Sequence, residues 1–342
     1  MDSGPLLAIR GTDMAKPDDE RPDGEWQSAN SAAYGELWST QRAALGVAGR
    51  TPFSEWFELN WEISNRYWAE FLNRRAPGRR LLECGGATGR LPVLLAKDGW
   101  DCTLVDITQE GPLLGRARFE QAQQKGWFVR GDVFALPFPD ETFDVVYSNG
   151  LLDVLPDIGT GIREMTRVLR PGGLFVAASN PRRLSVQTVF ERVLAWAARM
   201  RRLIRPRRDL RYRPPAAARP VFRNDFSLAA HLAACRAAGL DDAHGHGVGM
   251  LPVVALPGPL MRAYVKMTRA LAPLCVRFNW SEAPWTAKWG VMLAVYGVKT
   301  ARSVVDPRLG DQRGVRAVDV VEDRSSLSGS DQNVSPAKSS RT

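Results

Sequence analysis

The sequence contains few of the residues that build metal sites and disulfide frames. Its 342 residues include three histidines and four cysteines. The cysteines are Cys84, Cys102, Cys235 and Cys275. They form no C-x-x-C pair, and no histidine lies at metal-ligand spacing from any of them. His244 and His246 are close together, but no nearby acid or cysteine completes a site with them. We therefore expect no metal and reduced thiols, as in a cytosolic protein.

Long apolar runs are also missing. No apolar stretch approaches the roughly 20 residues that a membrane-spanning helix needs. The first residues, Met-Asp-Ser-Gly-Pro, lack the basic-then-apolar order of a signal peptide, which favours a cytoplasmic location. Hydrophobic residues still make up 44% of the chain, which is enough for one large domain with insertions or for two smaller domains.

A glycine-rich turn lies between two apolar patterns. Residues 80–83 read as a short strand that ends in an acid, and residues 91–97 have the pattern of a helix. Between them lie Gly85, Gly86 and Gly89. Such a turn exposes backbone N–H groups beside a helix N-terminus and is typical of nucleotide-binding sites, because glycine lets a ligand approach the backbone. The turn alone fits two families of nucleotide cofactor.

Strands and helices alternate through the middle of the chain. Further strands are predicted at residues 102–105, 127–130, 142–147 and 174–178, from Leu240 onward, and at 291–298. The alternation predicts an α/β fold: a doubly wound, Rossmann-like sheet of seven mainly parallel strands, with helices on both faces and helical cap insertions. Ligands of such sheets bind at the carboxyl ends of the strands. The polar residues predicted at those ends are Glu83, Asp106, Asp132 and Ser148.

The flanking segments differ in composition from this core. Residues 1–30 and the tail 301–342 have few apolar residues, so we predict disorder in both. Residues 31–75 are predicted to form a helical lid, and the aromatic residues between Phe53 and Phe71 are expected to pack on a core, to cover a ligand, or to do both. We assign residues 76–300 to the main domain, with an apolar, proline-rich insertion at 251–284.

An arginine-rich insertion spans residues 182–223. It holds 13 arginines against two acidic residues, a net charge of +11 when the whole chain carries +9. Its first half has the apolar periodicity of a basic amphipathic helix. Three roles fit: a solvated face over the sheet, contact of residues 184–213 with an anionic membrane surface, or nucleic-acid docking. Only Trp196 and Tyr212 interleave with the arginines, which disfavours nucleic acid.

Longer motifs distinguish between the two cofactor families. The three glycines do not reproduce the G-x-G-x-x-G of hydride-transfer domains, and a reductase would leave residues 131–148 unexplained. Glu83-x-Gly85-Gly86-x-x-Gly89, residues 131–148 and the turn at 167–173 together resemble the motifs of class I S-adenosylmethionine-dependent methyltransferases. The resemblance implies S-adenosylmethionine as the cofactor. The order Gly86-Ala87 departs from the family's usual D/E-x-G-x-G-x-G.

The resemblance implies roles for the residues at the strand ends. The acid matching Asp106, with Ile107 beside it, binds the ribose hydroxyls. The acid matching Asp132 accepts the adenine amino group, and the backbone of Val133 reads the ring edge. The other implied cofactor contacts are Glu83, Gly85, Gly86, Gly89 and Ser148. Each acid has a simpler alternative, in which it caps a helix or belongs to a turn.

The residues after the fourth strand limit which class of molecule can accept the methyl group. Residues 148–151 lack the prolines of enzymes that methylate amino groups of nucleobases or glutamine. Asp153 is a candidate base or substrate contact, or else a helix-start residue. Residues 179–185 loosely resemble a stretch of ubiquinone-biosynthesis methyltransferases, which act on isoprenoid phenols. We expect O- or C-methylation of a small, lipophilic or secondary-metabolite acceptor by in-line displacement. An RNA or protein methyltransferase that docks through its arginines is the alternative, and a noncatalytic membrane-associated module is a third.

Overall fold

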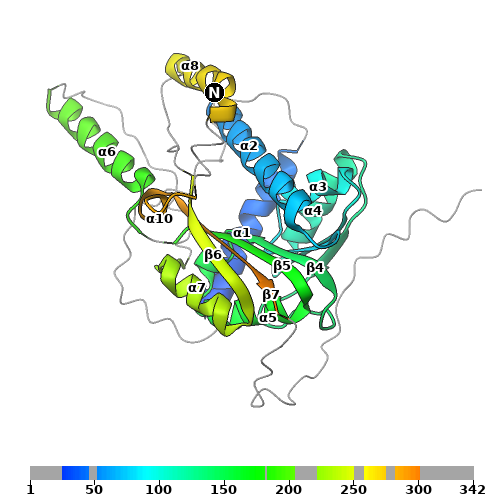
Figure 1. Cartoon of the computed structure of the whole chain (residues 1–342). Coiled ribbons are helices and arrows are strands. Elements are labelled where there is room, and N and C mark those ends of the chain that lie inside the picture. Colours follow the sequence, from blue (N-terminus) through cyan, green and yellow to red (C-terminus); the bar gives the residue numbers. More distant parts are fainter. Residues whose placement is uncertain are drawn as a thin grey trace, which may run out of the picture.

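A seven-stranded sheet forms the centre of the molecule (Figure 1). The computed structural model describes residues 25–45, 52–181, 183–204, 222–249, 258–274 and 282–300. The strands are β1 (Arg80–Cys84), β2 (Asp101–Asp106), β3 (Trp127–Arg130), β4 (Phe143–Asn149), β5 (Leu169–Ser179), β6 (Leu240–Val248) and β7 (Met292–Lys299). Their spatial order is β3-β2-β1-β4-β5-β7-β6. The predicted α/β fold class, with a seven-stranded and mainly parallel sheet, is confirmed.

The strand order places the carboxyl ends of the first strands together. β1 pairs in parallel with β2 on one side and with β4 on the other, so that Cys84 faces both Val105 and Ser148. The winding therefore reverses at β1, which creates the switch point where open α/β sheets bind ligands. β7 runs against its neighbours, because it is antiparallel to both β5 and β6.

Helices cover both faces of the sheet (Figure 1). They are α1 (Glu25–Ala43), α2 (Pro52–Arg75), α3 (Arg90–Lys97), α4 (Glu110–Gln121), the 3-10 helix η1 (Leu152–Val154), α5 (Ile158–Val168), α6 (Val186–Ile204), α7 (Leu228–Ala237), α8 (Gly258–Ala270) and α10 (Thr286–Trp289). Two apolar clusters fill the two layers. The consecutive residues Leu81 and Leu82 belong to different clusters, because neighbouring side chains of a strand point to opposite faces.

The aromatic residues of α2 pack on a core. Trp68 is buried and its ring meets Tyr147 of β4 with centroids 6.1 Å apart. Trp56 is buried against α8, where it stacks on Tyr264 at 5.7 Å. Of the two roles open for these aromatics, the structure supports packing on a core and gives α2 no place in the cavity described below.

Helix α1 corrects one expectation. It begins at Glu25, so residues 25–30 are helical. The prediction of disorder for residues 1–30 is therefore wrong for residues 25–30. An early apolar and aromatic residue, Trp26, packs edge-on against Phe134 with ring centroids 6.2 Å apart, which gives the helix a partner on the sheet domain. The predictions for residues 1–24, for most of the two insertions' loops and for the tail 301–342 lie outside the described residues and stay predictions.

Candidate functional site

The loop after β1 is a tight turn held against β2. Gly85 adopts φ +68°, a conformation that glycine favours, and both Gly85 N and Gly86 N donate to the carbonyl oxygen of Val105 at 2.9 and 3.2 Å. A side chain at Gly86 would meet the Glu83 carboxylate, because a Cβ there would lie 2.7 Å from its Oε2 atom. The glycines therefore let the loop fold back over the end of its own strand.

Asp106 ends β2 as a buried, partly satisfied carboxylate. Its Oδ1 atom accepts hydrogen bonds from Thr108 N at 2.9 Å and from Thr108 Oγ1 at 2.7 Å. Burial raises the pKa of Asp106, and the hydrogen bonds from Thr108 oppose that effect. Since Gly111 of α4 packs directly on the Asp106 side chain, the carboxylate is held in place at the strand end.

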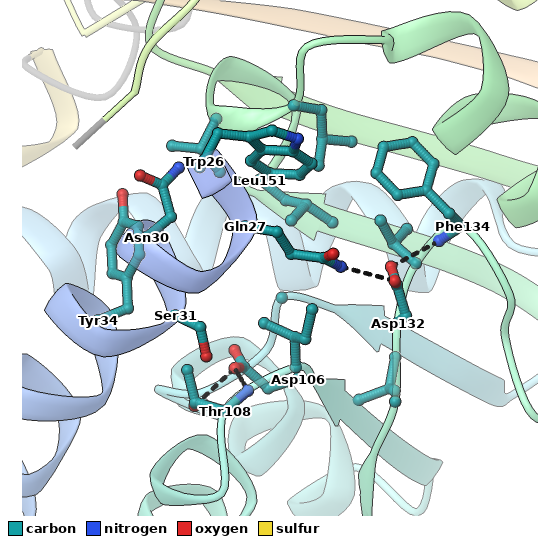
Figure 2. A pocket seen from close by; sticks show the side chains of 18 of the residues that line it. Trp26, Gln27, Asn30, Ser31, Tyr34, Asp106, Thr108, Asp132, Phe134 and Leu151 are labelled. Carbon is teal, nitrogen blue, oxygen red and sulfur yellow. Dashed lines mark hydrogen bonds between the residues drawn. The ribbon is translucent and has the colours of Figure 1, made fainter. Parts of the chain in front are cut away.

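Asp132 follows β3 and accepts two hydrogen bonds, one from its own loop and one from helix α1. Its Oδ1 atom accepts from Phe134 N at 3.0 Å, which closes the turn locally. Its Oδ2 atom accepts from Gln27 Nε2 of α1 at 2.7 Å, a contact between residues 105 positions apart. Figure 2 shows both bonds, with Gln27 reaching across from the helix to the strand end. One carboxylate oxygen is thus used within its own loop, and the other ties down α1.

A cavity of about 90 Å³ lies between α1 and the carboxyl ends of the strands (Figure 2). The strand-end side of its wall includes Gly85, Asp106, Ile107, Thr108, Asp132, Val133, Phe134, Gly150, Leu151, Val154 and Leu155. The α1 side consists of Trp26, Gln27, Asn30, Ser31, Tyr34 and Trp38. Helix α1 therefore forms one wall of the cavity and lies over the strand ends.

Five of the nine residues expected to contact the cofactor line this cavity: Gly85, Asp106, Ile107, Asp132 and Val133. The other four are Glu83, Gly86, Gly89 and Ser148, which lie outside its lining. Glu83 is buried behind the loop, and its Oε2 atom has no hydrogen-bond partner among the described residues. Burial, with a smaller contribution from Asp106, raises the pKa of Glu83 to about 8.

Asp153 lies in η1, where it is 1% exposed and is not part of the cavity lining. Its Oδ2 atom is 3.7 Å from Arg223 Nε. Asp157, rather than Asp153, caps helix α5 by accepting from Thr160 N. The carboxylate of Asp153 is therefore an internal charge paired with an arginine.

His231 of α7 is a packing residue. Its ring nitrogens lie 3.0 Å from Ser179 Oγ and 2.9 Å from the carbonyl oxygen of Ser227, so both are occupied within the fold. No group of three potential metal ligands occurs among the residues that the structure describes.

Of the six α1 residues in the cavity wall, Ser31, Tyr34 and Trp38 fall within the predicted helical lid at 31–75, whereas Trp26, Gln27 and Asn30 fall within the segment predicted to be disordered. The polar composition before Trp26 hid the start of the helix, although Trp26, Asn30, Tyr34 and Trp38 recur at the four-residue spacing of one helical face. That spacing was the available signal.

Comparison with known proteins agrees with this geometry. Residues 82–177 match the family described as "Methyltransferase domain". Residues 82–177 form a class I S-adenosylmethionine-dependent methyltransferase domain. The match covers β1 through β5, and the ends of β1, β2, β3 and β4 line the cavity.

Individual relatives align with only part of this chain. A demethylmenaquinone methyltransferase of Beutenbergia cavernae is 40% identical over 103 residues, 30% of this chain and 41% of the relative. A fatty-acid O-methyltransferase of Mycolicibacterium smegmatis is 33% identical over 146 residues, 42% of this chain and 52% of the relative. The chain thus spans about half the length of these curated relatives.

A solved SAM-dependent methyltransferase of Thermotoga maritima, described as a possible histamine N-methyltransferase, is 16% identical to this chain. It covers 72% of this chain and 94% of its own, with a TM-score of 0.43.

The chemical groups in the cavity wall match those of S-adenosylmethionine, the cofactor of this family. The adenosyl group offers ribose hydroxyls and an amino group as donors, and the wall holds two carboxylates, Asp106 and Asp132, as acceptors. Apolar side chains beside each acid, Ile107 and Val133, suit the faces of the adenine ring.

Proposed function

We propose that this protein transfers a methyl group from S-adenosylmethionine to a small, lipophilic acceptor by direct in-line displacement. The observation that carries the proposal is the cavity at the switch point of the sheet, with Asp106 and Asp132 in its wall. The family match over residues 82–177 supports the same chemistry.

Each cofactor role follows from the position of its residue. Asp106 would accept the ribose hydroxyls, since the hydrogen bonds from Thr108 hold one of its oxygens and fix the carboxylate. Asp132 would accept the adenine amino group, with Ile107 and Val133 against the ring. Gly85 would allow close approach of the cofactor to the backbone. Glu83, Gly86, Gly89 and Ser148 lie outside the cavity lining and stay proposed cofactor contacts.

The protein's contribution to methyl transfer would be alignment and exclusion of water. The sulfonium of S-adenosylmethionine supplies an electrophilic methyl group when the cofactor is bound, so no residue has to activate it. Trp26, Tyr34 and Trp38 of α1 cover the cavity and would keep water from the reacting centre. Asp153 lies outside the cavity wall, which argues against direct proton abstraction by its carboxylate.

The acceptor is proposed to be mostly apolar. The wall beyond the two acids includes Phe134, Leu151, Val154 and Leu155, which suit a hydrocarbon skeleton. The names of the two relatives, a demethylmenaquinone and a fatty-acid methyltransferase, are consistent with a lipophilic acceptor. The proposal includes both O- and C-methylation.

Calorimetry with S-adenosylhomocysteine tests the cofactor site. We expect wild type to bind it and Asp106→Ala to lose at least about tenfold in affinity, because a carboxylate with two ribose hydrogen bonds contributes over 1.4 kcal/mol. Asp101→Ala is the matched control, since Asp101 is an acid at the opposite end of the same strand. Absence of binding by wild type would refute the proposed function.

We also propose peripheral contact with an anionic membrane. Large apolar side chains are exposed at Leu184, Val189, Val193 and Trp196 on and before α6, at Leu260, Met267, Leu271 and Leu274 on and after α8, and at Trp285 and Trp289 around α10. Exposed basic residues of the same helices include Arg192, Arg199, Arg262, Lys266 and Arg269. Figure 1 shows α6 and α8 projecting away from the sheet. Apolar side chains mixed with cationic ones are typical of helices that bind anionic lipid surfaces.

No helix among the described residues is both long and apolar enough to cross a membrane, so the proposed contact is peripheral. Flotation with phosphatidylglycerol vesicles should recover wild type and lose Trp196→Glu. Trp127→Glu is the control, because Trp127 is 56% exposed on the edge strand β3, outside these helices. Equal recovery with neutral phosphatidylcholine vesicles, or a preference for RNA with a steep salt dependence, would refute the membrane proposal.

A further inference from the structure

Two side chains of α1 present hydrogen-bond donors to the cavity. Asn30 and Tyr34 lie one helical turn apart and both line it (Figure 2). Asn30 is 5% exposed, and its Nδ2 atom has no partner among the described residues. Because an unpaired buried N–H is costly, such an atom is uncommon in native folds and points to a ligand that accepts its hydrogen bond.

The neighbouring residues Phe222 and Arg223 determine which atoms of Asn30 and Tyr34 are left as donors. Phe222 N donates to Asn30 Oδ1 at 2.9 Å, which leaves the Nδ2 donor for the cavity. The Arg223 side chain lies close to the Tyr34 hydroxyl, where its positive charge opposes the rise in the pKa of Tyr34 that burial causes. Since a guanidinium carries only N–H donors, it cannot accept the hydroxyl hydrogen, which remains available to a ligand.

Arg223 is held in place by contacts of its own segment with the 3-10 helix η1. Its Nε atom lies 3.7 Å from Asp153 Oδ2, and the next residue, Asn224, ties the same segment to η1. Asn224 N donates to the carbonyl of Asp153 at 2.8 Å, and Asn224 Nδ2 donates to the carbonyls of Leu152 and Leu155. Burial raises the pKa of Tyr34, and the nearby Asp153 adds to this effect, so the hydroxyl stays protonated at neutral pH.

We propose that Asn30 and Tyr34 bind an acidic oxygen of the methyl acceptor, a carboxylate or a phenolic oxygen. Two oriented donors backed by the Arg223 cation match such an oxygen, because it accepts hydrogen bonds and is negatively charged as a carboxylate or once a phenol has lost its proton. Leu151 and Val154 continue the wall with apolar groups, which suits the carbon skeleton attached to that oxygen. The inference rests on the proposed function and defines the class of acceptor more narrowly.

Paired probes test the site in the S-adenosylhomocysteine complex. We would titrate decanoate against decanol, and 1-naphthol against naphthalene, and follow binding by tryptophan fluorescence. Wild type should bind at least one oxygen acid about tenfold more tightly than its neutral or oxygen-free analogue. Asn30→Asp keeps the acceptor for Phe222 N but replaces the donor by an anionic oxygen, so it should abolish that preference.

Tyr34→Phe removes only the hydroxyl and should reduce the preference several-fold, which provides a second variant with minimal effect on folding. Ala32→Asp adds the same charge as Asn30→Asp on the exposed side of α1 and should keep wild-type preference. Equal binding of each probe pair by wild type, or an unchanged preference in Asn30→Asp, would overturn the proposal.

The cofactor also carries a carboxylate, so the experiment must distinguish binding of the acceptor's oxygen from binding of the cofactor's carboxylate. 5′-Methylthioadenosine lacks the amino-acid part of S-adenosylhomocysteine. If Asn30→Asp and Tyr34→Phe weaken S-adenosylhomocysteine about tenfold and leave 5′-methylthioadenosine unchanged, the donors bind the cofactor carboxylate and the acceptor proposal is overturned. If wild type binds neither nucleoside, the proposed function fails; if it binds both without discriminating the acidic probes, only this inference fails.

Discussion

The bond between Gln27 and Asp132 predicts that α1 competes with the cofactor. Gln27 Nε2 donates to Asp132 Oδ2 at 2.7 Å, in the place proposed for the adenine amino group. Replacing Gln27 by Met removes the donor and keeps the length of the side chain. We therefore expect Gln27→Met to bind adenosyl ligands more tightly, since the ligand no longer has to displace this bond.

The size of the effect follows from the bond. A hydrogen bond to a charged group contributes about 1.5–3 kcal/mol net, and the partly buried position of this one places it at the lower end. Because about 1.4 kcal/mol corresponds to a tenfold change in an equilibrium constant, the gain should be roughly tenfold. Other contacts of α1, such as Trp26 on Phe134, persist in the variant and set the upper limit.

Calorimetry with adenosine and inosine separates this explanation from a general loosening of α1. Inosine has a carbonyl oxygen in place of the amino group, so Gln27→Met should improve binding of adenosine far more than binding of inosine. Ser39→Ala, on the exposed side of the same helix, should leave both unchanged. Unchanged or weaker adenosine binding by Gln27→Met would refute the reasoning.

Three further predictions concern stability. Arg167 is mostly buried and pairs with Glu164 at 2.8 Å and with Asp140 at 2.6 Å, so Arg167→Met should cost about 3–5 kcal/mol of unfolding free energy in urea titrations. Burial raises the pKa of Glu83 from 4.5 to about 8, so between these pH values the folded state keeps a proton that the unfolded state loses, and the free energy of unfolding falls as pH rises. Glu83→Gln should remove this pH dependence and be more stable than wild type by up to about 5 kcal/mol at pH 9. An unchanged pH dependence in Glu83→Gln would contradict the raised pKa. Trp68→Ala opens a cavity between α2 and the sheet and should cost about 3–5 kcal/mol, against a smaller loss for Trp68→Phe, as measured by thermal unfolding.

The sequence by itself determined the sheet and the positions of its polar ends. Strands and helices alternate with periods that local residue choice fixes, and parallel strands bring their carboxyl ends to one edge, so the pattern of residues was enough to place Asp106 and Asp132 there. Spacing between motifs also identified the family, because the glycine loop and the 131–148 stretch are local patterns.

Tertiary structure alone decided what covers that edge. Trp26, Asn30 and Tyr34 each lie more than 40 residues before β1, and Arg223 lies more than 60 residues after β4. Their proximity in the fold depends on how α1 docks across the strand ends, and docking is set by long-range packing rather than by local pattern. The sequence therefore determined where the candidate site lies, whereas the packing of α1 over it and the donors in its wall emerged only from the packed fold.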